Sequence, residues 1–348
     1  MNVIALGAFA LTFTIAYLLA PALIQRLHAL KYGQLAYEDA PQTHQKKTGT
    51  PTMGGLLFLI APIVLLAFDR SRSAVGLAVL IGGMAAIGFF DDYSSIKSGR
   101  NRGLRARTKL LASAVVAAVF LAIVGGEALS GACGTQALWS SGLYWFGQPC
   151  GLAVPLWFWW VLGILAITGS THAVNLTDGL DGLAAGTIVP PLLVLFVFAQ
   201  RFSGTMTVAT LCAASLGAIG AFLIFNRYPA RVFMGDTGSL ALGGLLAGAA
   251  IVSGVTLLIP IIGAVFVAEA LSVMIQVTSF KMTKRRVFRM SPLHHHFELG
   301  GWPETKVTRR FWTASLAVSA LAIVLAFVVR VASTIPQPEN STTTNTCS

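Results

Sequence analysis

The sequence predicts an all-α, polytopic integral membrane protein of about ten transmembrane helices. Only 11% of its 348 residues are charged and 55% are hydrophobic, whereas soluble domains carry about 25% charged residues. Apolar stretches of roughly 18 residues or more recur along the chain, and each is long enough to cross about 30 Å of hydrocarbon as a helix. The stretches are continuous rather than alternating, which excludes a transmembrane β-barrel and leaves helices as the spanning elements.

The expected helices follow the apolar stretches in chain order. We expect spans at approximately 2–25, 53–68, 74–90, 109–126, 153–172, 183–200, 206–225, 237–253, 256–280 and 310–332. The first span has no basic segment before it, so we expect no cleaved signal peptide. Residues 1–332 then form a single transmembrane domain, and the polar residues 333–348 are predicted to be a disordered tail.

The distribution of basic residues predicts the orientation in the membrane. All of the 24 Lys and Arg residues except Arg70, Arg72, Arg201 and Arg330 fall in one set of loops or at the span ends beside them. Because Lys and Arg accumulate in cytoplasmic loops, we expect that set to be cytoplasmic and both termini to be external. The net charge of +11 has the same explanation. Its dispersal over loops without a binding module argues against nucleic-acid binding.

Two features leave alternatives open. Cys133 and Cys150 share the external loop 127–152, where a disulfide is permitted but not required. Glu269 falls inside the expected span 256–280, where an acid costs about 2.5–3.5 kcal/mol. Either that span is broken around Gly263, or Glu269 faces the protein interior.

Five polar clusters lie in or beside the loops predicted to be cytoplasmic. The first, H-Q-K-K-T-G-T-P-T-M-G-G (44–55), offers two lysines for phosphate and glycines that let backbone approach a ligand. A positive-inside loop with a turn explains this cluster equally well. The second, G-F-F-D-D-Y (88–93), places Asp91 and Asp92 at a membrane border, where unpaired charge is costly. A metal or general-base role explains the pair, and a solvated acid pair is the alternative.

The third cluster is N-L-T-D-G-L-D-G-L (175–183). On a helix, Asp178 and Asp181 share a face, with Asn175 one turn earlier on the same face. The spacing fails the calcium-loop pattern, which needs ligands at alternate positions. The structural alternative makes Asp181 the N-cap of a helix that begins near Gly182, and it leaves Asp178 unexplained.

The fourth cluster, F-M-G-D-T-G-S (233–239), follows Asn226. Asp236 and Ser239 are predicted to cap the next span, and a carboxylate flanked by glycines also suits Mg²⁺ held against a pyrophosphate. Phe233 either lies at the membrane interface or stacks on a base.

The fifth cluster, S-P-L-H-H-H-F-E-L (291–299), contains three consecutive histidines. Successive helix residues diverge by about 100°, so we do not expect one run to supply three zinc ligands. One or two of the histidines are predicted to act as acid–base groups or phosphate donors, and Glu298 has no assignment. Together the five clusters indicate one composite site for a phosphorylated cytosolic substrate, Mg²⁺ and a lipid co-substrate.

Across residues 44–312, the five motifs in this order resemble the polyprenyl-phosphate N-acetylhexosamine-1-phosphate transferase family, specifically its members with a peptide-bearing donor. The resemblance implies that undecaprenyl phosphate attacks the β-phosphate of UDP-N-acetylmuramoyl-pentapeptide. The products are lipid I and UMP, in the first membrane step of peptidoglycan synthesis. The resemblance also implies an Mg²⁺ cofactor and a multi-pass protein of the bacterial inner (cytoplasmic) membrane with periplasmic termini. The oligomeric state stays open, with a homodimer as one alternative.

The resemblance assigns roles to individual residues. Asp236 would ligate Mg²⁺. Asp91 would deprotonate the lipid phosphate or, alternatively, Asp92 would act as a covalent nucleophile. The catalytic group also includes His294, His295 and His296. The substrate-binding residues in this assignment are Lys47, Thr52, Asn175, Asp178, Asp181, Asn226, Phe233, Ser239 and Gln276.

Two other functions compete with this interpretation. A sister transferase would use a UDP-N-acetylhexosamine without the peptide, and the segment L-H-H-H-F-E (293–298) argues against it. A proton-coupled transporter would place its acids near the bilayer midplane, whereas most acids here lie at cytoplasmic span ends.

Overall fold

The computed structural model describes residues 3–30, 49–98, 103–129, 142–145, 148–153, 156–203 and 205–334. Lys47, Cys133 and residues 335–348 lie outside these ranges. The structure therefore does not describe one predicted phosphate-binding residue, the pair for which a disulfide was left open, or nearly all of the predicted tail.

The described chain is helical apart from one hairpin. Its elements are α1 (Val3–Ala29), η1 (Gly54–Leu59), α3 (Ile60–Phe68), α4 (Arg72–Ser98), α5 (Ala106–Leu129), β1 (Gly142–Trp145), β2 (Gln148–Ala153), α7 (Leu156–Thr177), α8 (Leu183–Thr187), α9 (Val189–Phe198), η2 (Ala199–Ser203), α10 (Met206–Asn226), α11 (Gly235–Val252), η3 (Thr256–Leu258), α12 (Ile259–Ile262), α13 (Ala264–Thr283), α14 (Leu293–Glu298) and α15 (Glu304–Thr334). Within the described residues, nine helices are long and apolar enough to cross a membrane, and a shorter apolar segment covers Gly54–Phe68. The predicted all-α polytopic class is confirmed.

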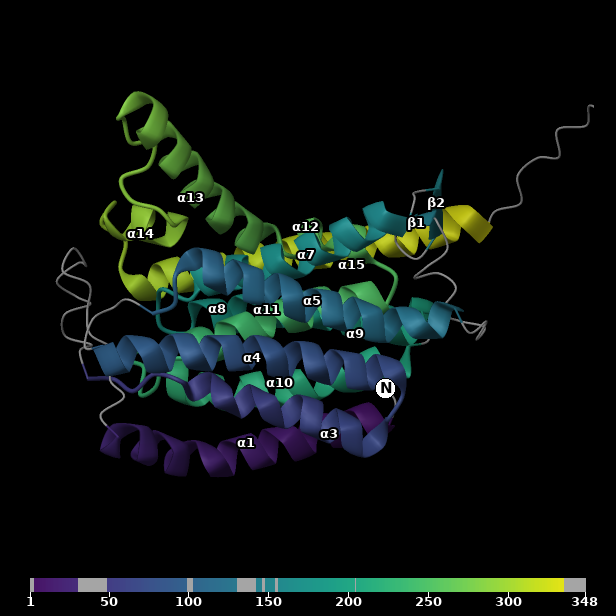
Figure 1. Ribbon diagram of the computed structural model, residues 1–348, viewed down its shortest axis with the longest axis horizontal. Helices are drawn as coiled ribbons and strands as arrows, with labels where there is room; N and C mark the ends of the chain where they lie inside the picture. Colours follow the sequence, from purple (N-terminus) through teal and green to yellow (C-terminus); the bar gives the residue numbers. More distant parts are fainter. Residues whose placement is uncertain are drawn as a thin grey trace, which may run out of the picture.

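The long helices lie side by side along one axis, and α11 is at the centre of the bundle (Figure 1). Every residue of α11 from Thr237 to Val252 is buried. α11 packs against α4 on one side and α7 on another, while α10 packs against α1. The glycines and alanines of α11 allow these close helix approaches, which is the usual composition of helix interfaces inside membranes.

Three expected spans are interrupted rather than continuous. The expected span 53–68 begins as the 3-10 turn η1 and continues as α3, and the span 183–200 is divided into α8 and α9. The span 256–280 breaks at Gly263, between α12 and α13. Glu269 is also fully buried on α13, so both explanations proposed for this acid are confirmed. Past the break, α13 projects away from the bundle (Figure 1).

A short antiparallel hairpin is the one departure from the all-α expectation in the described chain. β1 pairs with β2, with Gly142 opposite Ala153 and Tyr144 opposite Pro149. The N-terminal end of the chain and the far end of α15 lie at the end of the bundle opposite α14 (Figure 1). This agrees with an even number of crossings, while the external side remains a prediction.

Candidate active site

Acidic and amide side chains from three helices converge on one lysine at the end of the bundle that carries the sequence motifs. Lys109, near the start of α5, contacts Asp91 Oδ2 at 3.1 Å and also pairs with Asp236 Oδ2. Asn175, near the end of α7, donates to Asp236 Oδ1 at 2.7 Å and to Ser239 Oγ at 2.9 Å. The structure therefore brings together residues from the second, third and fourth motifs.

Asp92 points to the N-terminus of α11 and is only 8% exposed. Its Oδ1 accepts from the Asp236 amide at 3.1 Å, and its Oδ2 accepts from the Thr237 amide at 3.0 Å and the Thr237 hydroxyl at 2.7 Å. The prediction that Asp236 and Ser239 cap this helix is wrong, because its N-cap residue is Met234 and makes no side-chain cap bond. A carboxylate from α4 satisfies those free amides instead.

Lys109 is the residue of this cluster that the sequence analysis did not single out. In the sequence it is one of many positive charges in the predicted cytoplasmic loops. A usable signal exists, however, because a lysine in the first turns of a helix opposes the helix dipole and needs a separate reason to be there. Asp91 and Asp236 supply that reason in the fold.

The first and fourth motifs pair through their backbones. The Phe233 amide donates to the Pro51 carbonyl at 2.8 Å, and the Gly54 amide donates to the Phe233 carbonyl at 2.9 Å. Gly235 has a φ of 72°, and a Cβ there would stand 2.7 Å from Thr52 Oγ1 and 2.6 Å from Asp92 Oδ2. Thr52 therefore lies at the carboxylate cluster, and Phe233 is half-buried beside it.

Asp181 and Asn226 hold the turn before α8 to the loop after α10. Asp181 Oδ2 accepts from the Ala230 amide at 2.9 Å, and Asn226 Oδ1 accepts from the Gly182 amide at 3.0 Å. The Asp181 amide in turn donates to Glu304 Oε1 at 2.7 Å. The prediction that Asp181 caps α8 is wrong, since the N-cap residue is Gly182, which has no side chain to supply a cap bond.

Asp178 lies in the turn after α7, which ends at Thr177. The shared helix face predicted for Asp178 and Asp181 is therefore not formed. Burial, together with the negative charges of Asp236, Asp92 and Asp181, raises the pKa of Asp178 well above its ordinary value. A carboxyl group in this environment favours a hydrogen-bond-donating form or a nearby cationic partner.

The three histidines of α14 have three different environments. His294 is buried and faces Glu269, with Nδ1 3.2 Å from Oε1. His295 Nδ1 lies 2.8 Å from Glu298 Oε2, which gives Glu298 a partner. His296 Nδ1 accepts from the Arg289 amide at 3.1 Å.

His294 also approaches the third motif. A Cβ on Gly179 would stand 2.9 Å from its Cε1, and its buried Nε2 has no hydrogen-bond partner within the described residues. Burial lowers the pKa of His294, although Glu269 opposes that shift. Burial therefore favours the neutral form of the His294 imidazole, which packs against the N-L-T-D-G turn.

Gln276 is occupied by structural bonds. Its Oε1 accepts from the amides of Val287 at 3.0 Å and Phe288 at 2.9 Å, and its Nε2 donates to the Phe288 carbonyl at 3.0 Å. These bonds fix the loop that leads from α13 to α14. His172, one turn before Asn175 on α7, has a buried Nε2 without a partner among the described groups.

The donor set near Lys109 suits a divalent cation. Mg²⁺ takes oxygen ligands and usually binds through one or two carboxylates plus substrate phosphates. Asp91 and Asp236 present carboxylate oxygens to one shared cationic group, the Lys109 ammonium. Within the described residues no group of three or more His, Cys, Asp or Glu side chains forms a metal site. These residues therefore suit a cation whose remaining ligands come from the substrate, rather than one held entirely by protein side chains.

Comparison with known proteins identifies close relatives. Residues 74–254 match glycosyl transferase family 4, and residues 47–59 match phospho-N-acetylmuramoyl-pentapeptide-transferase signature 1. A phospho-N-acetylmuramoyl-pentapeptide-transferase of Heliobacterium modesticaldum is 45% identical over 332 residues, covering 93% of this chain and 98% of the relative. The same-named protein of Desulforudis audaxviator is 46% identical over 330 residues, covering 91% and 97%. That of Geobacillus kaustophilus is 44% identical over 324 residues, covering 91% and 96%.

Proposed function

Because the chain belongs to the phospho-N-acetylmuramoyl-pentapeptide transferases of glycosyl transferase family 4, we propose that it transfers phospho-N-acetylmuramoyl-pentapeptide from UDP to undecaprenyl phosphate. The products are lipid I and UMP. The family predicted from the five motifs is confirmed by these relatives. The reaction exchanges one pyrophosphate linkage for another, so catalysis consists mainly of positioning and charge neutralisation.

One observation carries the proposal: carboxylates from α4 and α11 converge on the Lys109 ammonium, with Asn175 fixing the second of them. A pyrophosphate substrate is strongly anionic and needs a cationic centre held by fixed acids. Asp236 would hold Mg²⁺ there, with Asp91 beside it on the other side of Lys109. When bound, that ion would neutralise phosphate charge and polarise the bond that breaks. Lys109 supplies a second positive charge at the same place.

The two adjacent aspartates have different capacities to accept a proton. Both oxygens of Asp92 are committed to the N-terminus of α11. Asp91 accepts from the Leu104 amide at 2.7 Å and pairs with Lys109, which leaves lone pairs free, since a carboxylate has about four acceptor sites. We therefore assign Asp91 as the group that takes the proton of the lipid phosphate, and Asp92 as the residue that positions Asp236.

The remaining predicted residues fall into two groups in this proposal. The first group lies at the carboxylate cluster and the α14 turn, and we assign it to binding of the nucleotide sugar. Its members are Thr52, Asp178, Ser239, Phe233 and His295. Asp181, Asn226 and Gln276 hold loops around that region through the bonds described above. Lys47 retains its predicted role at the nucleotide phosphates from the signature match alone.

The setting follows from the same family. The chain is a multi-pass membrane protein, and we assign it to the bacterial inner membrane with its site on the cytoplasmic side, where UDP-linked donors are made. The sister function, transfer from a UDP-N-acetylhexosamine without peptide, is the alternative that the assay must exclude.

The test is UMP release by the purified protein with undecaprenyl phosphate and each UDP donor in turn, over an Mg²⁺ titration. We expect turnover with the pentapeptide donor only, a requirement for Mg²⁺, and a loss of at least 10²-fold in Asp236→Asn. Asp69→Asn is the matched control, because Asp69 is bonded to Thr207 and Ser71, before α4 and remote from the site. Turnover of only the UDP-N-acetylhexosamine, or near-normal activity in folded Asp236→Asn, contradicts the assignment.

A further inference from the structure

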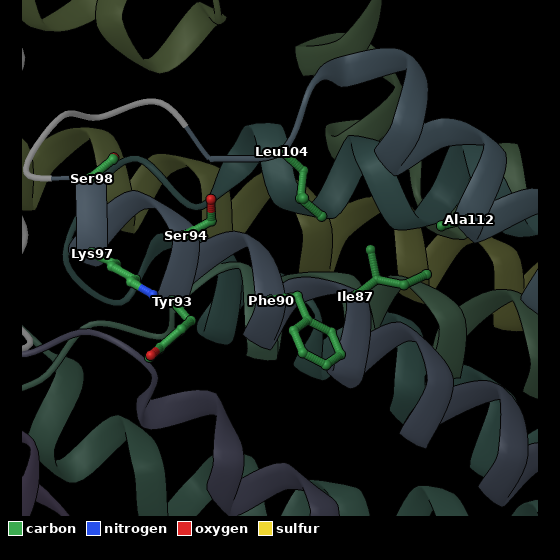
Figure 2. Close-up of a pocket in the computed structure, with 8 residues that line it drawn as sticks. All are labelled: Ile87, Phe90, Tyr93, Ser94, Lys97, Ser98, Leu104 and Ala112. Carbon is green, nitrogen blue, oxygen red and sulfur yellow. The ribbon is translucent and has the colours of Figure 1, made fainter.

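A cavity of about 610 Å³ lies between α4 and α5, separate from the loops assigned to the nucleotide sugar. Figure 2 shows its lining side chains, which come from the last three turns of α4 and from the facing side of residues 104–112. The size falls in the range of about 300–1,000 Å³ typical of small-molecule sites.

The cavity has two ends of different polarity. Ile87, Phe90, Leu104 and Ala112 line the end farther from the α4 terminus, and Tyr93, Ser94, Lys97 and Ser98 line the end near that terminus. Because α4 ends at Ser98, the polar end is the one that reaches the predicted cytoplasmic surface. The cavity therefore matches an amphiphile with an anionic head and an apolar tail.

The cavity opens beside Asp91. On α4, Ile87, Asp91, Ser94 and Ser98 follow one another at spacings of four, three and four, which places them on one helix face. Leu104 lines the cavity with its side chain, while its amide donates to Asp91 Oδ1 at 2.7 Å. A ligand head at the polar end is thus next to the carboxylate assigned to take a proton.

We propose that this cavity binds the phosphate and the first isoprenoid units of the polyprenyl phosphate acceptor, an inference that rests on the proposed function. Lys97 supplies the positive charge for the phosphate, with the hydroxyls of Ser94 and Ser98 beside it. The apolar end holds the first units of the chain. A cavity of this volume takes only that part of a long polyprenyl chain, and the remainder lies in the bilayer.

The proposal is tested by placing a bulky side chain in the cavity. Ala112→Phe places a ring in the apolar end, and Val115→Phe is the matched control, because Val115 is on the same helix, 62% exposed, and absent from the cavity wall. We expect Ala112→Phe to raise the KM for a prenyl phosphate at least tenfold with the KM for the UDP donor unchanged. Phe90→Ala, which removes an exposed wall residue, is the second variant and should raise the same KM several-fold.

A binding measurement without the UDP donor separates this proposal from the proposed function. The probe is a C15 prenyl phosphate bearing a diazirine, cross-linked to the protein and mapped by mass spectrometry, with phosphatidylglycerol as competitor. The proposal is supported if cross-links form on α4 and residues 104–112, if Ala112→Phe removes them, and if they persist in the presence of phosphatidylglycerol. Equal cross-linking in Ala112→Phe and Val115→Phe, or full displacement by phosphatidylglycerol, overturns it. Cross-linking without any UMP release would instead refute the proposed function.

Discussion

Replacing Asp92 separates a positioning role from a covalent one. Its carboxylate accepts three hydrogen bonds from the start of α11, and bonds to a charged group contribute about 1.5–3 kcal/mol each. These contributions are not additive, and losing a helix cap costs about 0.5–2 kcal/mol. We therefore expect Asp92→Ala to lower the free energy of unfolding by about 3 kcal/mol, and Asp92→Asn by about half, since its amide oxygen still accepts.

The assay pairs thermal unfolding in detergent with an Mg²⁺ titration of UMP release. Domains of about 150–250 residues lose about 2–4 °C per kcal/mol, so we expect the midpoint of Asp92→Ala to fall by about 6–12 °C. Misplacing Asp236 should also raise the Mg²⁺ concentration needed for half-maximal rate, with partial recovery in Asp92→Asn.

Asp91→Asn is the matched control, because Asp91 accepts from the Leu104 amide and pairs with Lys109, whereas Asp92 accepts from the backbone amides of α11. We expect it to lose more activity and less stability than Asp92→Asn. The positioning role is refuted if Asp92→Asn keeps its melting midpoint and Mg²⁺ response while its rate drops to background, or if a phosphoryl group is trapped on Asp92.

Three further predictions concern the same site. Lys109→Met should bind Mg²⁺ about tenfold more tightly, because the Lys109 ammonium competes with the ion for Asp236, but it should release UMP more slowly. Mg²⁺-dependent thermal stabilisation measures the affinity, and UMP release measures the rate. An unchanged Mg²⁺ affinity would refute the competition. Because burial depresses the pKa of His294, the folded state binds fewer protons than the unfolded state below about pH 6.5. Stability should therefore fall between pH 7 and 5.5, and less so in His294→Gln; parallel melting curves decide this. Gly235→Ala should cost at least about 1–2 kcal/mol for its positive φ, whereas Gly82→Ala, whose new Cβ meets nothing within 4 Å, should be neutral in the same melting assay.

The sequence predicted the membrane fold well because its signal is long and continuous. About twenty consecutive apolar residues can cross a bilayer only as a helix, so the long spans were predictable. The gathering of the motifs at one end of the bundle followed from the order of those spans. The break at Gly263 and the burial of Glu269 were predicted only as alternatives. The structure shows both, because the way α13 leaves the bundle is a property of packing rather than of local sequence.

The bonds inside the site were less predictable, because they join distant segments. A local reading assigned the α11 cap to Asp236 and Ser239 and the α8 cap to Asp181, whereas the fold uses Asp92 for the first and leaves the second uncapped by a side chain. Lys109 was concealed by the general excess of cytoplasmic lysine. Its role emerges only when α4, α5 and α11 are in place.

Several of the predicted site residues bind backbone amides rather than other side chains. Asp181 holds the amide of Ala230, and Gln276 holds the amide of Val287. Such a bond requires a particular side chain at one position and only a backbone N–H at the other. We therefore expect positions 230 and 287 to accept many different side chains as long as Asp181 and Gln276 are kept. Proline, which lacks the amide hydrogen, is the replacement that both positions should exclude.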